Sequence, residues 1–221
     1  GNADVTDVYM SQDKGARVHC RDVLAKRAGI ANVALNTFST TADEGSTVYL
    51  NRSNHGTIDN YAAVDANDVL GQLVFGGSDT DSLESGGRIA VGAAETWDAD
   101  SRGSEMQFQL VPSGVNSTTL TTRIHVDGNG MVGIGETSNA NMTQGLTINQ
   151  GAADDQILAF KSSDVAHGMT DIIETDTYGA FAKQGAGDGG LQIQSFCDAG
   201  TIALSFQGAC VSDITTKSTS G

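Results

Sequence analysis

The residues of this chain that most often carry chemistry are few and widely spaced. Its histidines and cysteines are His19, His55, His125, His167, Cys20, Cys197 and Cys210. No histidine lies at metal-ligand spacing from another ligand, and we expect His125, in a predicted strand, to face solvent or a neighbouring chain. The three cysteines match no zinc pattern and are a poor basis for a disulfide framework. We therefore expect no metal ion and no cofactor, and we interpret the cysteines as small buried apolar residues.

Carboxylates are abundant, with 27 Asp and Glu in 221 residues, and they suggest two kinds of site. Glycoside hydrolysis uses a pair of carboxylates, and the candidates beside predicted strands are Glu105, Asp171 and Glu174. A cation between chains could bind acids of two loops, namely Asp79, Asp81 and Glu84, or Asp98 and Asp100. Because acids are so numerous, their proximity in sequence discriminates little. We favour solvated loop acids and predict no catalytic residue.

Two glycine-rich segments are predicted to be turns. Residues 127–130 read Asp-Gly-Asn-Gly, but apolar Met131 and Val132 follow where a calcium loop needs further oxygen ligands. Alternating residues on both sides favour a β-hairpin instead. Residues 185–190 lack the Lys-Ser/Thr and the helix of a phosphate loop. No Gly-x-Ser-x-Gly nucleophile motif precedes a helix either. The sequence therefore predicts a protein that is not an enzyme.

Two aromatic residues in polar loops are candidates for contact with glycans. Tyr61 lies in the loop 53–66 and Trp97 in the loop 92–104. An aromatic ring at a polar surface can stack on a sugar ring, although anchoring its own loop is the more common role. We keep both residues as possible contacts with a host-surface glycan.

Composition favours many short strands and a thin core. The chain has 28 Gly but one Pro, its hydrophobic fraction is 38%, and only 5% of its residues are aromatic. Glycine allows frequent tight turns, and so small a core favours association with identical chains. The net charge of −15 disfavours binding to nucleic acid or to anionic membranes. No apolar run has the length of about 20 residues that membrane insertion requires.

The pattern divides the chain into three parts. Residues 1–44 contain a basic stretch and form a connector or docking segment, with a helix over 16–28 or a strand and loop in its place. Residues 45–136 and 137–221 are β-rich, and we expect the second part to continue beyond the end of the chain. Gly133 and Gly135 lie on one face of a strand, where another backbone can approach closely, as near a threefold axis. The predicted strands are 47–52, 69–75, 88–91, 105–110, 122–126, 131–135, 145–148, 157–161, 172–174, 180–182, 191–196 and 202–206.

Residues 45–136 resemble a module of phage tail-fibre and virion structural proteins. The module's outline includes "D-x-L-G-x-L-x-F-x-G-x-D", which residues 68–79 match, and Arg88-Ile89 and Met106-Gln107-Phe108 follow in the expected order. Residues 123–135 then match its "R-I-x-V-D-x-x-G-x-V-G-I-G" hairpin. The order and spacing over some ninety residues carry the resemblance. Beyond residue 150 the likeness is general.

The resemblance implies an all-β fold of short antiparallel strands and hairpins in an elongated, intertwined homotrimeric fibre. It also implies an extracellular location on the virion, where the chain would contact other virion proteins and support host attachment. Two alternatives remain open. One is a polysaccharide-depolymerising tailspike, and the other is a non-viral secreted adhesin.

Overall fold

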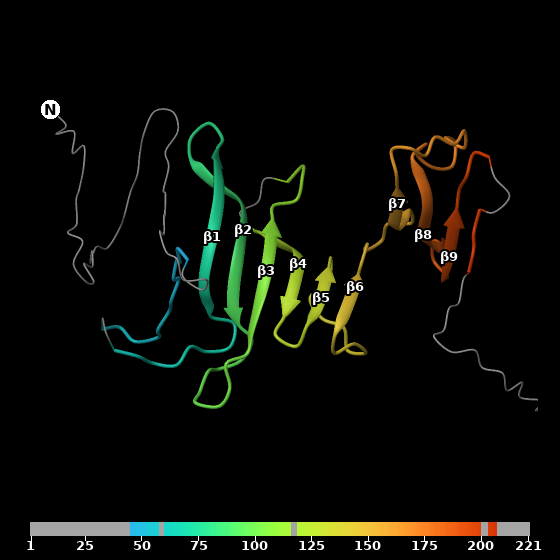
Figure 1. Cartoon of the computed structure of the whole chain (residues 1–221). Helices are drawn as coiled ribbons and strands as arrows, with labels where there is room; N and C mark the ends of the chain where they lie inside the picture. The colour runs from blue at the N-terminus through green and yellow to red at the C-terminus, as the bar shows by residue number, and fades with distance from the viewer. Residues whose placement is uncertain (1–44, 58–59, 116–118, 200–202, 207–221) are drawn as a thin grey trace, which may run out of the picture. The chain divides into compact units, whose positions relative to one another are not determined.

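The computed structural model describes residues 45–57, 60–115, 119–199 and 203–206 (Figure 1). The chain divides into two compact units, residues 1–49 and 50–221. All nine strands of the described residues lie in the second unit, and these residues contain no helix. The prediction of an all-β fold of mostly antiparallel strands is therefore confirmed for the described residues. The connector 1–44 and its expected helix over 16–28 lie outside the described residues.

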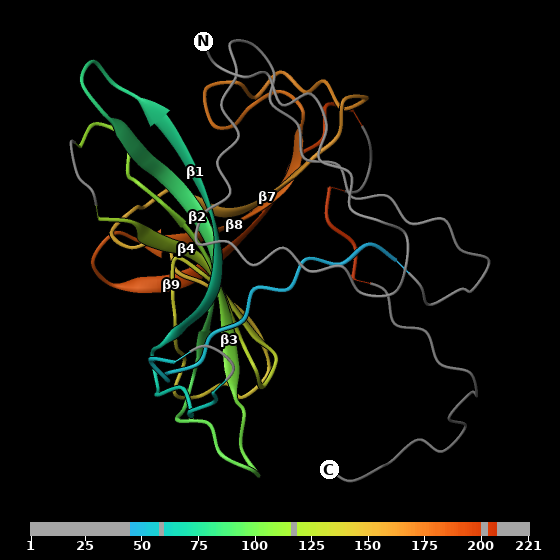
Figure 2. The same ribbon diagram turned by 90° about the vertical axis from the view of Figure 1, so that its left-hand side faces the viewer.

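Six strands form one sheet whose spatial order follows the order of the chain. They are β1 (Val69–Ser78), β2 (Leu83–Ala93), β3 (Ser104–Leu110), β4 (Thr121–Asp127), β5 (Met131–Ile134) and β6 (Gly145–Ile148). Neighbouring strands pair antiparallel, except that β5 and β6 are parallel. Figure 2 shows β1 as a long, curved ribbon. β6 lies beyond the predicted module boundary at residue 136, yet it completes this sheet.

The turn between β4 and β5 has the predicted hairpin form. Oδ1 of Asp127 accepts hydrogen bonds from the backbone N–H groups of Asn129, at 3.0 Å, and Met131, at 2.8 Å. The N–H of Gly130 donates to the carbonyl of Asp127, and Gly130 has a φ of 98°, which favours glycine. The carboxylate of Asp127 therefore organises a turn, as the Asp-Gly-Asn-Gly pattern predicts.

Close backbone approach at Gly133 and Gly135 is also present, but the approaching backbone belongs to the same chain. A Cβ at Gly133 would lie 2.1 Å from the carbonyl oxygen of Glu136. A Cβ at Gly135, where φ is 70°, would lie 2.2 Å from the carbonyl oxygen of Asn149. The two glycines therefore permit the chain to leave β5 and return alongside it as β6.

Three strands form a second, antiparallel sheet in the order β7-β8-β9. They are β7 (Gln156–Lys161), β8 (Thr177–Gly185) and β9 (Gly189–Ser195). The predicted glycine turn joins β8 to β9, and Gly189 and Gly190 both have positive φ. The connection from β7 to β8 contains His167, which is 1% exposed. Its Nε2–H donates to the carbonyl of Thr177 at 2.7 Å, which joins the connection to β8.

The structure differs from the predicted strands at three places. Residues 47–52 and 203–206 pair with no strand, and residues 172–174 form part of a turn. In that turn the N–H groups of Ile172 and Ile173 both donate to the carbonyl of Met169. An apolar pair is compatible with a strand, but a strand also needs a pairing partner, which these segments lack. β1 and β2 are longer than predicted, and the turn between them begins at Asp79.

Candidate self-association surface

The register of the six-stranded sheet brings apolar residues from every strand into one row. Leu73, Ile89, Phe108, Ile124, Ile134 and Ile148 are successive cross-strand partners from β1 to β6. A second row on the same face consists of Gly71, Val91, Met106, Val126, Val132 and Leu146. Phe75, Gly87 and Leu110 form a third, shorter row. We call this side of the sheet the apolar face, because none of these residues is charged.

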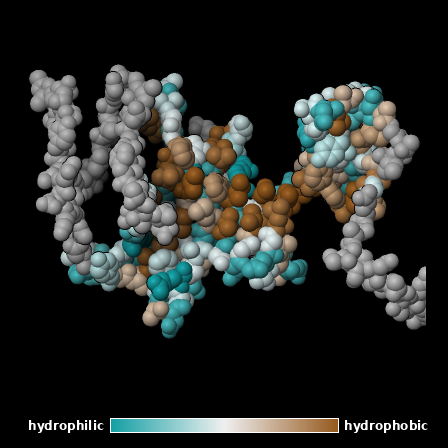
Figure 3. All heavy atoms as spheres, viewed as in Figure 1, coloured by the Kyte–Doolittle hydropathy of each residue, from teal (hydrophilic) through white to brown (hydrophobic). Residues whose placement is uncertain are grey.

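The apolar face is open to solvent in the part of the chain that the structure describes. Leu73, Phe75, Leu110 and Leu146 are each more than half exposed, and Phe75 reaches 60%. Figure 3 shows apolar side chains gathered over the strands of this sheet. Leu50 lies against Gly71 of β1. A Cβ added at Gly71 would lie 2.6 Å from the Cβ of Leu50. Monomeric soluble proteins rarely expose so large a contiguous apolar patch.

The opposite face of the same sheet is polar and forms its own hydrogen-bond network. The guanidinium of Arg88 donates to the side-chain oxygens of Gln72, at 2.9 Å, and Gln109. Beside them, Gln107 donates to Oε1 of Glu105 at 2.6 Å. These polar side chains bond to one another, so they need no second chain as a hydrogen-bond partner. The apolar face differs, because its large side chains are in contact with solvent.

The polar network also includes His125, which is 4% exposed. Its Nε2 lies 2.9 Å from Oε2 of Glu105. Its Nδ1 is buried and has no hydrogen-bond partner. The predicted interpretation of His125 as facing solvent or another chain is wrong, because residues of its own chain bury it.

A groove of about 600 Å³ lies in the apolar face around Gly87. Its apolar side chains come from Phe75, Ile89, Phe108, Leu110 and Ile124, and Arg123 also lines it. Gly87 has no side chain to fill the space, and a Cβ there would lie 2.7 Å from Cδ2 of Leu110. The register shifts between Phe108 and Gln109, so Arg123 has no partner on β3. The unpaired residue of this irregular stretch, Arg123, is the one that lies beside the groove.

The second sheet has a similar division between a covered and an open side. Leu158, Phe181 and Ile193 are cross-strand partners, and Leu158 and Ile193 are 41% and 49% exposed. The ring of Phe160 packs against that of Phe181 in an edge arrangement, with centroids 6.0 Å apart. Ala180 and Ala182, which alternate with Phe181 along β8, are buried. Each sheet thus leaves apolar side chains exposed on one side.

The two candidate glycan contacts have different surroundings. Tyr61 is 88% exposed and lines a small cleft of about 310 Å³. Its other lining residues are Asn51, Arg52, Ser53, His55, Gly56, Thr57 and Asn60. Trp97 is half-buried, and its indole N–H donates to the carbonyl of Gly103 at 3.0 Å. The ring of Trp97 anchors its loop, whereas that of Tyr61 is accessible to a ligand.

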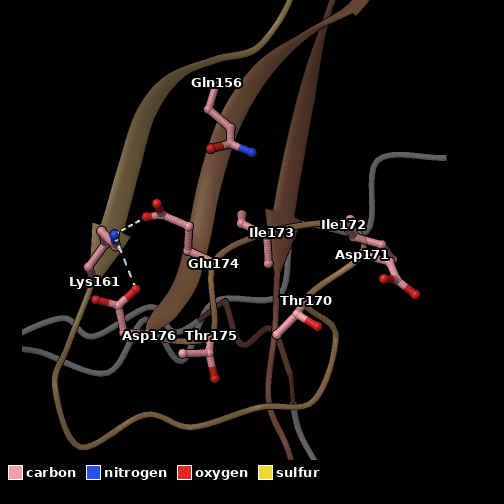
Figure 4. A pocket seen from close by; sticks show the side chains of 9 residues that line it. All are labelled: Gln156, Lys161, Thr170, Asp171, Ile172, Ile173, Glu174, Thr175 and Asp176. Carbon is pink, nitrogen blue, oxygen red and sulfur yellow. Dashed lines mark hydrogen bonds and ion pairs between the residues drawn. The ribbon is translucent and has the colours of Figure 1, made fainter.

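The structure does not bring the candidate carboxylates together as a catalytic pair. Glu105 belongs to the polar network of the first sheet, whereas Asp171 and Glu174 lie in the β7–β8 connection. Figure 4 shows the carboxylates of Asp171 and Glu174 pointing in different directions. Lys161 donates hydrogen bonds to Glu174 and Asp176. Both bonds raise the pKa of Lys161, and the bond to Glu174 has the larger effect. Lys161, Glu174 and Asp176 thus form an exposed cluster of ion pairs, which lines an open cavity of about 900 Å³.

The loop acids act within their own turns. Oδ1 of Asp79 accepts the backbone N–H groups of Asp81 and Ser82, both at 3.1 Å. Oδ1 of Asp98 accepts those of Asp100, at 2.8 Å, and Ser101, at 2.7 Å. These N–H groups lower the pKa of both carboxyls below the ordinary value for Asp. The described residues contain no group of three His, Cys, Asp or Glu side chains placed to hold a metal ion.

The chain matches no protein-family model, and comparison with curated proteins finds no significant match. Within the described residues, no helix has the length and apolar character to cross a membrane. The function must therefore be inferred from the surfaces of the two sheets. Sequence reasoning missed the groove at Gly87 and the position of Arg123 beside it, since neither has a local signal in the sequence.

Proposed function

We propose that this chain is a structural segment of a viral fibre or appendage, that it works as a homotrimer, and that it supports attachment to a host surface without catalysing a reaction. The observation that carries the proposal is the apolar face, on which the rows of cross-strand partners extend over all six strands. The arginine and glutamine side chains of the polar face bond to one another, whereas the large side chains of the apolar face are left exposed to solvent.

Identical chains are the simplest cover for this face. Each chain carries a net charge of −15, so two copies repel unless they meet on a surface without acids. The rows of the apolar face contain no charged residue. Burying apolar surface contributes roughly 25 cal/mol per Å², which favours such contact. Closed rotational symmetry is the usual outcome when identical chains associate, and a trimer satisfies it.

The topology suits a spacer. Because strand order follows chain order, each successive strand advances the chain by about 4.8 Å across the sheet. The placement on a virion rests on the resemblance of residues 68–79 and 123–135 to the fibre module. Repeated weak contacts at a supported tip would then gain strength through avidity. A depolymerase receives no support from the separated carboxylates, and a non-viral adhesin would share the same assembly.

The proposal is tested by two substitutions at adjacent positions of β1. Leu73 is 53% exposed on the apolar face, and Val74 is 49% exposed on the opposite face, where it pairs with Arg88. We expect the wild-type chain to sediment at about three times 22.8 kDa. Leu73→Asp should dissociate the trimer, because it introduces a charge into the buried interface, whereas Val74→Asp should leave the mass unchanged. A monomeric wild-type chain would overturn the proposal, and equal effects of both variants would remove the apolar face as its basis.

A further inference from the structure

The tip of the β1–β2 hairpin carries an apolar side chain that the described residues of its own chain leave uncovered. Leu83 begins β2 opposite Ser78 and is 84% exposed. Acidic residues surround it in the sequence, namely Asp79, Asp81 and Glu84. Exposure of a leucine side chain to water is unfavourable. The pairing of β1 with β2 fixes Leu83 at the end of the sheet.

The charge of this tip is built into the turn. Oδ1 of Asp79 accepts two backbone N–H groups, which favour its ionised form. The hydroxyl of Ser82 lies within hydrogen-bond distance of the carboxylates of Asp81, at 3.3 Å, and Glu84, at 2.7 Å. The tip therefore presents one leucine within a compact negative surface.

The groove at Gly87 has the complementary chemistry. Its lining is apolar apart from Gln109 and the two arginines Arg88 and Arg123, and it contains no carboxylate. Arg88 is engaged by glutamines of the polar face, so Arg123 is the exposed cation available at the groove. An apolar side chain with acidic neighbours matches this surface in both shape and charge.

The tip cannot fill the groove of its own chain. Leu83 and Gly87 lie on the same strand and pair with Ser78 and Phe75 of β1, with one shift of the register between Phe75 and Gly76. Four extended residues span roughly 13 Å, so Leu83 is held well away from Gly87. A second copy of this chain carries a matching tip that is free to reach the groove.

We propose that the tip of the β1–β2 hairpin of one copy docks into the Gly87 groove of the next copy, with Leu83 in the groove and the acidic side chains facing Arg123. This contact is head-to-tail, because the two copies contribute different surfaces, and three such contacts close into a ring. The inference rests on the proposed self-association. It adds a specific contact that determines which surface of one copy meets which surface of its neighbour.

Substitutions at four exposed positions test this contact in the whole chain by sedimentation. Leu83→Asp should weaken association about tenfold or more, since it places a charge in an apolar groove. Arg123→Glu should weaken it too, and the reversed tip Asp81→Lys/Glu84→Lys should restore association when combined with Arg123→Glu. Ile172→Asp, at an apolar position of the β7–β8 connection that is 64% exposed, is the control and should have no effect.

Co-expression of two tagged variants separates a head-to-tail contact from a symmetric one. A Leu83→Asp chain retains its groove, and an Arg123→Glu chain retains its tip, so the pair should form one intact contact and yield a heterodimer. A wild-type trimer that Leu83→Asp leaves intact would overturn the docking inference and preserve the proposed function. The groove would then be covered by another segment, such as residues 1–44. A monomeric wild-type chain would instead overturn the proposed function.

Discussion

Single acidic residues of this chain organise turns. Asp79, Asp98 and Asp127 each accept two backbone N–H groups through Oδ1. An Asp that bonds to the backbone a few residues ahead stabilises a turn without a regular ladder. Asp79 and Asp98, which the sequence offered as cation ligands, therefore have a structural role in folding the loops between strands.

Replacing Asp98 by Asn should change how stability depends on pH. The native pKa of Asp98 lies below the ordinary value for an aspartate, because the N–H groups of Asp100 and Ser101 favour the carboxylate. Its contribution is thus fully present above about pH 4 and is lost as pH falls through the native pKa. Thermal melts should show Asp98→Asn less stable than wild type near neutral pH, with the difference shrinking in acid.

The matched control for this experiment is Asp155→Asn, which changes an exposed acid of the segment before β7. It should leave the pH dependence close to that of wild type. Protonation of Asp98 removes the stability that its carboxylate contributes, so the difference between Asp98→Asn and wild type should become smaller in acid. A difference that stays constant from about pH 7 to about pH 3 would contradict this assignment.

At the scale of elements, the parallel pairing of β5 and β6 depends on a tight return of the chain. The N–H of Gly135 donates to the carbonyl of Arg123, and the N–H of Asn149 donates to that of Ile134. The connection over residues 135–144 also contacts β6, since Asn139 donates to Oγ1 of Thr147 at 2.9 Å. Short parallel connections without a helix are unusual, and here glycine makes this one possible.

Gly135→Ala should disrupt the β5–β6 pairing. Its φ of 70° is strained for alanine, and the new Cβ would lie 2.2 Å from the carbonyl oxygen of Asn149. The strain alone costs about 1–3 kcal/mol. Hydrogen-exchange measurements should show faster exchange of the backbone amides of β6. A thermal melt should show a lower melting temperature. Gly187→Ala is the control, because a Cβ at Gly187 would have no atom within 4 Å. Equal stability of the two variants would contradict this account.

At the scale of the whole molecule, charge and apolar surface act in opposite directions. The net charge of −15 keeps copies apart, whereas the open faces of the two sheets favour association. Few hydrophobic residues are buried within the described part of one chain, and three of the seven are in the second sheet and its connection. We therefore expect the stability of the protein to depend on contact with other chains more than that of a compact domain does.

Added salt should strengthen the proposed trimer. Screening reduces repulsion between acidic copies, and the Debye length falls to about 10 Å at 0.1 M salt. One local contact between Arg123 and an acidic tip would weaken, but net repulsion between whole chains is the larger effect. Sedimentation at increasing NaCl should show dissociation moving to lower protein concentration. Weaker association in salt would mean that charge pairs dominate the interface.

Local patterns were sufficient to predict most strands. The alternation in residues 105–110 and 122–126, and the turn at Asp127–Gly130, correspond to β3, β4 and their neighbouring hairpin. The same reasoning failed at residues 172–174, because a short apolar pair has no information about whether a partner strand lies beside it. Trp97 could not be distinguished from Tyr61 by sequence either, since the bond to Gly103 forms only in the folded loop.

The sequence by itself determined the all-β class, most strands and the principal hairpin, because alternation and turn residues act over a few neighbouring positions. Only the tertiary structure decided the register that aligns Leu73 with Ile89 and Phe108, the parallel return of β6, and the groove around Gly87. These features depend on pairing between separate segments. A shift of one residue in that pairing would move a strand's apolar side chains to the other face, so the face that remains open is a property of the assembled sheet.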